Sequence, residues 1–192
     1  MQQVKIFKLE SGAEPWDWVA WEDQQVDIGF RFRFERAPAE FRCPKLIPLG
    51  LKKMGGKSIR HDVYADIPHH QVTSVLCLSG AAFSAIGPFL SKADQVFPLK
   101  SRLGEYYAIN LLRVIDCLDL GRVEAQWFQQ GVSASAIWKY AFRPRTIPRR
   151  AVFSVPQFEM ATLVTEPVIQ AIEERNLRGY GYRELESIEP FE

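Results

Sequence analysis

Two stretches near the start of the chain alternate between apolar and polar residues. Residues 4–9 alternate in this way and predict an opening strand. A second stretch, residues 28–35, places one set of side chains on each face: Ile28, Phe30, Phe32 and Phe34 against Gly29, Arg31, Arg33 and Glu35. A period of two residues is typical of a half-buried strand. Between residues 34 and 68 the repeated prolines and glycines predict loops and short strands instead of helix.

A helix is predicted after Ser79. This serine can cap a helix that carries Phe83, Ile86 and Leu90 at helical spacing. Gly87 and Pro88 interrupt the pattern and predict a kink or a second short helix.

A second helix is predicted after Thr165. Pro167 falls in its first turn, and Val168, Ile169 and Ile172 share one face. We expect Thr165 to cap this helix and Gly179 to end it. Residues 180–185 then return as a strand.

The middle of the chain contains three further apolar segments. Residues 106–116 fit either a buried strand or a helix by period alone, and their aromatic content favours a strand. Residues 136–142 and 151–155 predict two more strands, with Pro144 and Pro148 fixing the turn between them. The whole pattern predicts an α+β fold: one domain, a mostly antiparallel sheet and a few short helices packed on it.

Three polar residues interrupt the run YYAINLLRVIDCLDL at residues 106–120: Asn110, Asp116 and Asp119. A buried amide or carboxylate without partners costs about 1–3 kcal/mol, so such residues normally sit in satisfied networks or at segment ends. We therefore interpret Asn110 and Asp116 as structural polar residues and Asp119 as a turn or cap residue.

This run resembles a known family when it is taken together with two later runs, TIPRRAVFSVP and TLVTEPVIQAIEERNLRGYGYREL. The family is the immunity protein 11 family of bacterial polymorphic toxin systems, formerly a domain of unknown function. The resemblance covers about Val75 to Leu185, so we divide the chain into a β-rich, loop-rich part at residues 1–74 and a family-like α+β core at residues 75–192, within one domain. It implies a cytoplasmic protein that binds and neutralises a cognate protein toxin, and it brings no catalytic residue with it.

Composition is compatible with one globular domain. The chain has 192 residues, of which 47% are hydrophobic. Its 24 basic and 23 acidic residues are balanced, which argues against nucleic acid as the default partner. One local basic cluster stands out against this balance: Arg143, Arg145, Arg149 and Arg150.

Cysteine usage and the absence of long apolar runs bear on the compartment. Cys77 and Cys117 lie in apolar runs and are predicted to be buried, whereas Cys43 lies among polar residues and is the candidate for exposure. An odd number of widely spaced cysteines indicates a reducing compartment. The first residues do not resemble a signal peptide, and no apolar run approaches the length of about eighteen residues needed for a membrane span. We expect a cytoplasmic protein.

The candidates for catalysis, metal binding and phosphate binding each lack part of the required pattern. The run LKKMGGKS does not have the glycine spacing of a phosphate loop, and Ser79 lacks the glycine two places earlier that a nucleophile elbow needs. The histidines, His61, His69 and His70, have no accompanying metal-binding motif. We predict no catalytic residue, no metal and no cofactor.

The densest aromatic feature is the group Trp16, Trp18 and Trp21. Tryptophan is common both in cores and at the centres of protein interfaces, and the pattern favours neither. With Arg31 and Arg33 these residues form the predicted partner-binding surface, because they lie outside the segment that resembles the family scaffold.

Three functions remain open from the sequence. The leading hypothesis is a non-catalytic immunity protein. The second is a small cytoplasmic hydrolase that uses Asp116, Asp119 and a histidine. The third is a nucleic-acid-associated protein that uses the arginines at 143–150, with Trp138 and Tyr140 as stacking groups.

Overall fold

The structure is a computed structural model. It describes residues 4–11, 18–21, 36, 46–48, 65–70, 75–101, 104–143 and 146–188. The predicted strand at residues 28–35 lies outside these residues, as do Cys43, His61 and the run LKKMGGKS.

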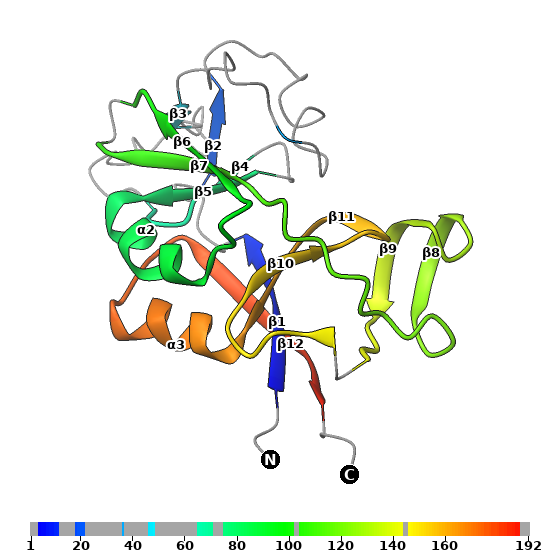
Figure 1. The fold of residues 1–192 in the computed structure, drawn as a ribbon. Helices are drawn as coiled ribbons and strands as arrows, with labels where there is room; N and C mark the ends of the chain where they lie inside the picture. Colours follow the sequence, from blue (N-terminus) through cyan, green and yellow to red (C-terminus); the bar gives the residue numbers. More distant parts are fainter. Residues whose placement is uncertain are drawn as a thin grey trace, which may run out of the picture.

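The largest sheet has the strand order β10-β11-β1-β12, and all of its neighbours are antiparallel. Its strands are β1 (Val4–Ser11), β10 (Val152–Val155), β11 (Phe158–Thr165) and β12 (Tyr180–Ile188). The strands predicted at residues 4–9, 151–155 and 180–185 are therefore confirmed. Because β1 lies between β11 and β12, an early segment of the chain is built into the sheet formed by its latest segments (Figure 1).

A second antiparallel sheet has the order β5-β7-β6, with β5 (Leu76–Ser79), β6 (Gln95–Leu99) and β7 (Tyr106–Asn110). The strand expected at residues 106–116 is confirmed, although it ends at Asn110. A third small sheet contains β2 (Trp18–Trp21), β3 (Leu46–Pro48) and β4 (His69–His70), in the order β3-β2-β4.

The remaining strands, β8 (Glu124–Gln129) and β9 (Ser133–Lys139), form an antiparallel hairpin. The strand predicted at residues 136–142 corresponds to β9, but it begins and ends three residues earlier. It pairs with β8, whereas β10 pairs with β11. The segment with Pro148 thus connects two different sheets.

Two helical regions pack together beside the sheets (Figure 1). The first consists of α2 (Gly80–Ile86), followed directly by the 3-10 helix η2 (Gly87–Phe89). The Ser79 Oγ accepts a hydrogen bond from the Ala82 amide at 3.1 Å, which confirms the predicted cap. The second is α3 (Glu166–Glu174), and Ile86 and Ile172 are both completely buried in the core that the two helices share.

Two expectations about α3 were wrong. Thr165 occupies the cap position, but its Oγ1 makes no hydrogen bond to the helix and accepts from the Ala151 amide at 3.0 Å. The helix ends at Glu174, with Arg175 as its C-terminal cap, well before Gly179. Gly179 has φ +88°, and a Cβ placed there would lie 2.1 Å from the Ala65 Cβ. This glycine permits a close approach of two segments and does not terminate the helix.

A second core lies between the main sheet and the β8–β9 hairpin. Its members include Ile6, Leu118, Phe153 and Leu163, none more than 1% exposed. Cys77 and Cys117 are fully buried, as predicted. The fold is α+β with mostly antiparallel sheets, which confirms the predicted class. None of the helices described is long and apolar enough to cross a membrane.

Candidate partner-binding site

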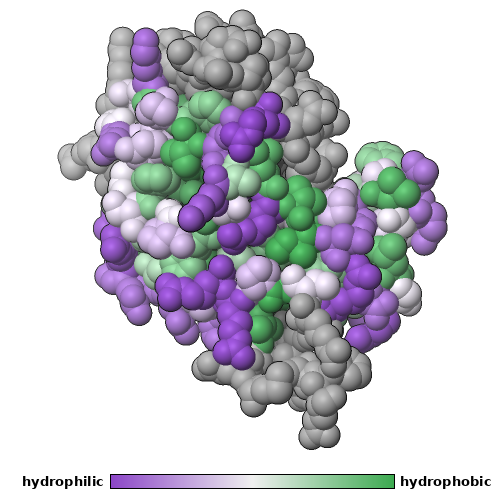
Figure 2. Space-filling model, viewed as in Figure 1, coloured by the Kyte–Doolittle hydropathy of each residue, from purple (hydrophilic) through white to green (hydrophobic). Residues whose placement is uncertain are grey.

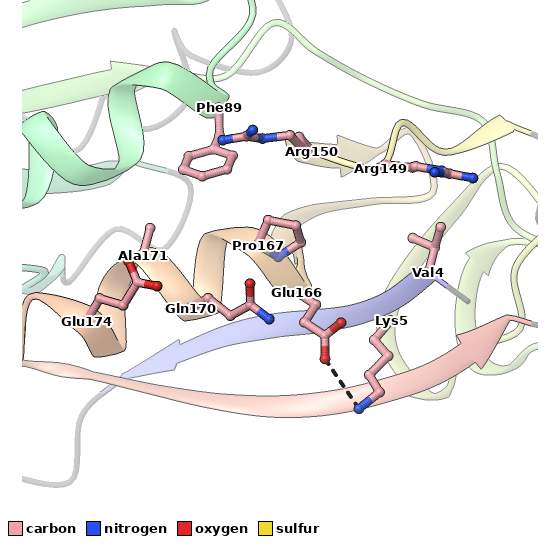
Figure 3. Close-up of a pocket in the computed structure, with 10 residues that line it drawn as sticks. All are labelled: Val4, Lys5, Phe89, Arg149, Arg150, Glu166, Pro167, Gln170, Ala171 and Glu174. Carbon is pink, nitrogen blue, oxygen red and sulfur yellow. Dashed lines mark ion pairs between the residues drawn. The ribbon is translucent and has the colours of Figure 1, made fainter. Parts of the chain in front are cut away.

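A surface groove of about 470 Å³ lies beside α3 (Figure 3). Residues from four parts of the chain line it: Val4 and Lys5 of β1, Phe89 of η2, Arg149 and Arg150 before β10, and Glu166, Pro167, Gln170, Ala171 and Glu174 of α3. The groove therefore joins segments that are more than 140 residues apart in sequence.

Arg149 and Arg150 are exposed and line the wall opposite α3 (Figure 3). The next residue, Ala151, is held against the start of α3, because its amide donates to Thr165 Oγ1 at 3.0 Å and its carbonyl accepts from the Thr165 amide at 3.1 Å. The Arg150 guanidinium carbon lies 4.9 Å from the centre of the Phe89 ring, a cation–π contact. The arginine segment is thus positioned both by backbone hydrogen bonds and by a buried aromatic ring.

The other charges of the groove are distributed unevenly. Lys5 Nζ and Glu166 Oε1 form an ion pair at 3.3 Å, so these two charges largely offset one another. Glu174 lies at the end of the groove away from this pair (Figure 3). Within the described part of the chain, neither Arg149 nor Arg150 forms an ion pair with a carboxylate. The wall that they form is consequently cationic.

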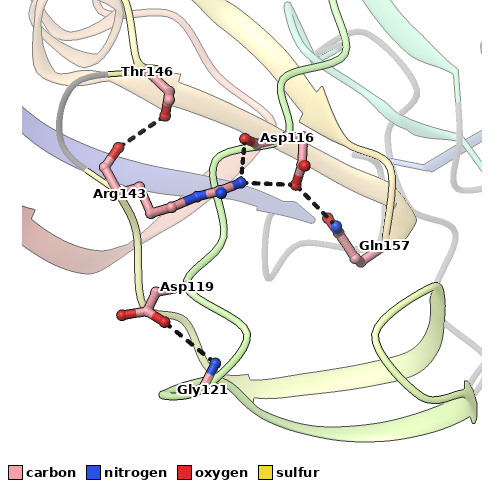
Figure 4. A network of polar contacts seen from close by, with 6 residues as sticks. All are labelled: Asp116, Asp119, Gly121, Arg143, Thr146 and Gln157. Atoms are coloured by element: carbon pink, nitrogen blue, oxygen red, sulfur yellow. Dashed lines mark hydrogen bonds and ion pairs between the residues drawn. The ribbon is translucent and has the colours of Figure 1, made fainter.

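A polar network supports the segments around the hairpin (Figure 4). Arg143 Nη2 lies 3.2 Å from Asp116 Oδ1 and donates to the Asp116 carbonyl at 2.7 Å. Gln157 Nε2 donates to the same Oδ1 at 3.1 Å. Asp119 Oδ1 accepts from the Gly121 amide at 3.2 Å, in the turn that leads into β8. These contacts tie the chain before β8 to the segments that follow β9 and β10.

The three polar residues singled out in the sequence lie in different surroundings. Asn110 is fully buried, and its Nδ2 donates to Gln95 Oε1 at 3.0 Å on the neighbouring strand. Asp116 is exposed, and Asp119 is half-buried in its turn. The structural role of these three residues stays a prediction.

The β8–β9 hairpin projects away from the rest of the molecule and carries exposed apolar side chains (Figures 1 and 2). Phe128, Val132 and Trp138 are 81%, 55% and 64% exposed. Phe128 and Trp138 are skipped in the pairing register, so each sits at an irregularity of the hairpin. Bulges of this kind re-aim side chains, which accounts for two large aromatic groups turned toward solvent.

Trp138 and Tyr140, which could have stacked on nucleic acid bases, do not both lie at the surface. Trp138 is exposed, but Tyr140 is only 5% exposed and its ring stacks on Phe142 with centroids 5.7 Å apart. Burial raises the pKa of Tyr140 to about 12. Tyr140 is a core residue.

The thiol of Cys117 is held in its protonated form. Burial, together with the nearby negative charge of Asp116, raises the pKa of Cys117 to about 12. Within the described residues, no group of three or more His, Cys, Asp or Glu side chains is placed to hold a metal ion.

The predicted partner surface is only partly described. Trp18 and Trp21 are the end residues of β2. Trp16, Arg31 and Arg33 lie outside the described residues, so the structure does not test whether the five residues lie together.

The sequence indicates the basic cluster but not the groove, because Phe89 and α3 reach Arg149 and Arg150 only through the tertiary fold. The adjacent arginines of the run IPRRAV were the available signal.

The geometry defines a small α+β protein with a charged groove and a projecting apolar hairpin, both of them surfaces suited to binding. Residues 94–187, just under half of the chain, match the model of an immunity protein family, Imm11. The match confirms the family resemblance over a segment that contains β6, β7, the hairpin, the arginine pair and α3. No curated protein matched the chain.

Proposed function

We propose that this protein neutralises a cognate toxin by binding to it, without catalysing a reaction of its own. The observation that carries the proposal is the match of residues 94–187 to an immunity protein family. A specific protein–protein contact typically covers about 800 Å² on each partner, so a binder of this size needs only a modest part of its surface.

The surroundings of the candidate catalytic groups support a binding role. Asp116 is engaged by Arg143 and Gln157, and Asp119 accepts a hydrogen bond within its own turn. The Cys117 thiol is buried and protonated near neutral pH, which makes it a poor nucleophile.

Co-expression with the cognate toxin tests the proposal. Cells that carry both should grow, whereas cells with the toxin alone should not. A variant with alanine at His61, His69, His70 and Asp119 should protect as well as the parent protein, provided that its thermal unfolding is unchanged. Loss of protection in this folded variant would point to the hydrolase hypothesis instead.

We further propose that Trp16, Trp18, Trp21, Arg31 and Arg33 contribute to the contact with the toxin. Truncating an interface hot spot costs about 2 kcal/mol or more, which corresponds to roughly thirtyfold in affinity. At least one of Trp16→Ala, Trp18→Ala and Trp21→Ala should weaken toxin binding by that factor in a calorimetric titration. Full affinity in all three variants would remove this segment from the interface.

A further inference from the structure

We infer that the groove between α3 and the Arg149–Arg150 segment receives an acidic segment of the cognate toxin. The inference rests on the proposed function, because it names the part of the surface and the partner chemistry through which neutralisation would act.

One wall of the groove carries positive charge that can complement an acidic segment. Arg149 and Arg150 are adjacent, exposed and without a carboxylate partner in the part of the chain that the structure describes. The planar guanidinium group presents paired N–H donors that match the two oxygens of a carboxylate. Lys5 contributes little additional charge, because Glu166 already pairs with it at 3.3 Å. The unpaired positive charge of the groove therefore comes from the two arginines, and the ligand that it favours is an anion.

The cationic wall of the groove is also positioned before any partner binds. The Arg150 guanidinium already rests over Phe89, and Ala151 is fixed to Thr165 by two backbone hydrogen bonds. Phe89 is held in turn, because its carbonyl accepts from Arg113 Nη1 at 3.0 Å. A cation that is positioned before binding loses less conformational freedom on contact, so more of its interaction energy appears as affinity.

The size and lining of the groove favour a peptide segment over an isolated ion. Its volume of about 470 Å³ lies within the usual range for a specific binding pocket. Pro167 and Ala171 provide apolar surface between the polar ends. A segment with a carboxylate next to an apolar side chain would contact both kinds of surface.

Glu174 makes the two ends of the groove different in charge. Its carboxylate lies at the far end of α3 from Glu166 (Figure 3). An acidic group at that end would be repelled, so a carboxylate of the bound segment belongs beside Arg149, which points toward the opposite end (Figure 3).

Charge reversal in the full 192-residue chain tests this assignment. The test variant is Arg149→Glu with Arg150→Glu. The matched control is Lys92→Glu with Lys100→Glu, which changes the net charge equally at two exposed positions outside the groove lining. Because Arg150 also packs over Phe89, Arg149→Glu alone serves as a second test variant that leaves that contact intact. Thermal unfolding verifies that each variant is folded.

Protection in co-expression and toxin binding in vitro are the two toxin readouts. We expect the double variant to bind the toxin at least tenfold more weakly and to lose protection. Arg149→Glu alone should also weaken toxin binding. The control variant should bind and protect like the parent protein. Retained binding in both test variants would overturn the inference while leaving the proposed function standing. Failure of the parent protein to protect would overturn the proposed function and the inference together.

Two synthetic probes separate a protein partner from nucleic acid. A peptide of alternating glutamate and leucine should bind the parent protein, and binding should weaken with added salt and with Arg149→Glu. A peptide with lysine in place of glutamate should not bind. If a single-stranded DNA oligonucleotide binds through the arginines and the acidic peptide does not, the groove is a nucleic-acid site and the inference fails.

Discussion

Gly179 marks a point where two segments approach so closely that no side chain fits between them. A Cβ at this position would lie 2.1 Å from the Ala65 Cβ and 3.0 Å from the Ala65 Cα, and the backbone has φ +88°. Both features disfavour alanine, the first by contact with another segment and the second by local backbone strain.

Gly179→Ala should therefore lower the free energy of unfolding by about 2 kcal/mol or more, measured by denaturant titration. Gly104→Ala is the matched control, since Gly104 also has a positive φ, +115°, but nothing within 4 Å of an added Cβ. The difference between the two variants isolates the contact with Ala65. Equal losses would mean that backbone strain alone accounts for the effect.

The raised pKa of Cys117 predicts a loss of stability at high pH. In the unfolded chain the thiol has its ordinary pKa of about 8.5, whereas in the folded protein it is about 12. Between these values the unfolded state releases a proton that the folded state retains, so the free energy of unfolding falls as pH rises. The contribution is fully present below about pH 8.5. Cys117→Ala should show a shallower decline between pH 8.5 and 11 in urea titrations. A decline as steep as that of the parent would assign the effect to other groups, such as Tyr140.

At the scale of elements, the β8–β9 hairpin has two faces with opposite roles. Ala134 and Ile137 are 8% and 6% exposed and pack in the second core, while Phe128 and Trp138 turn outward. A two-stranded hairpin is marginally stable alone, so its inner face must hold it to the rest of the protein.

Phe128→Ser and Trp138→Ser should each change the free energy of unfolding by no more than about 0.5 kcal/mol, because exposed side chains contribute little to folding. Ile137→Ser, on the inner face, should cost about 3 kcal/mol through lost burial and an added hydroxyl group in the core. Denaturant titration of the three variants provides the comparison. A large loss from Phe128→Ser would show that its ring is covered by another part of the chain.

The elements that could be predicted from the sequence are those whose signals are local. The alternation of residues 4–9 predicts a strand, and the capping residue Ser79 predicts a helix. Thr165 carries the same local signal, yet its hydroxyl bonds to Ala151, a residue that only the sheet brings near. Gly179 was misassigned for a similar reason, because the need for a glycine there comes from Ala65. The groove depends on Phe89, Arg150 and α3 meeting in space, which local patterns do not encode.

At the scale of the whole molecule, the two apolar cores are connected through the main sheet, in which β1, β10 and β11 each contribute side chains to both cores. Phe7 of β1 belongs to the core beneath the helices, and its neighbour Ile6 belongs to the core beneath the hairpin. Successive side chains of a strand point to opposite faces, so β1 contributes to both cores at once. Correct placement of this strand links the groove side of the molecule to the hairpin side.

The position of β1 also determines when the main sheet can form during synthesis of the chain. Its partners are residues 158–165 and 180–188, so during synthesis residues 4–11 leave the ribosome long before either edge can be paired. At ordinary rates of translation the interval is roughly ten to forty seconds. Until this interval has passed, the main sheet cannot form completely, and α3 lacks part of the surface against which it packs. Under the proposed function, only copies whose synthesis began earlier by this interval are folded and able to bind a toxin.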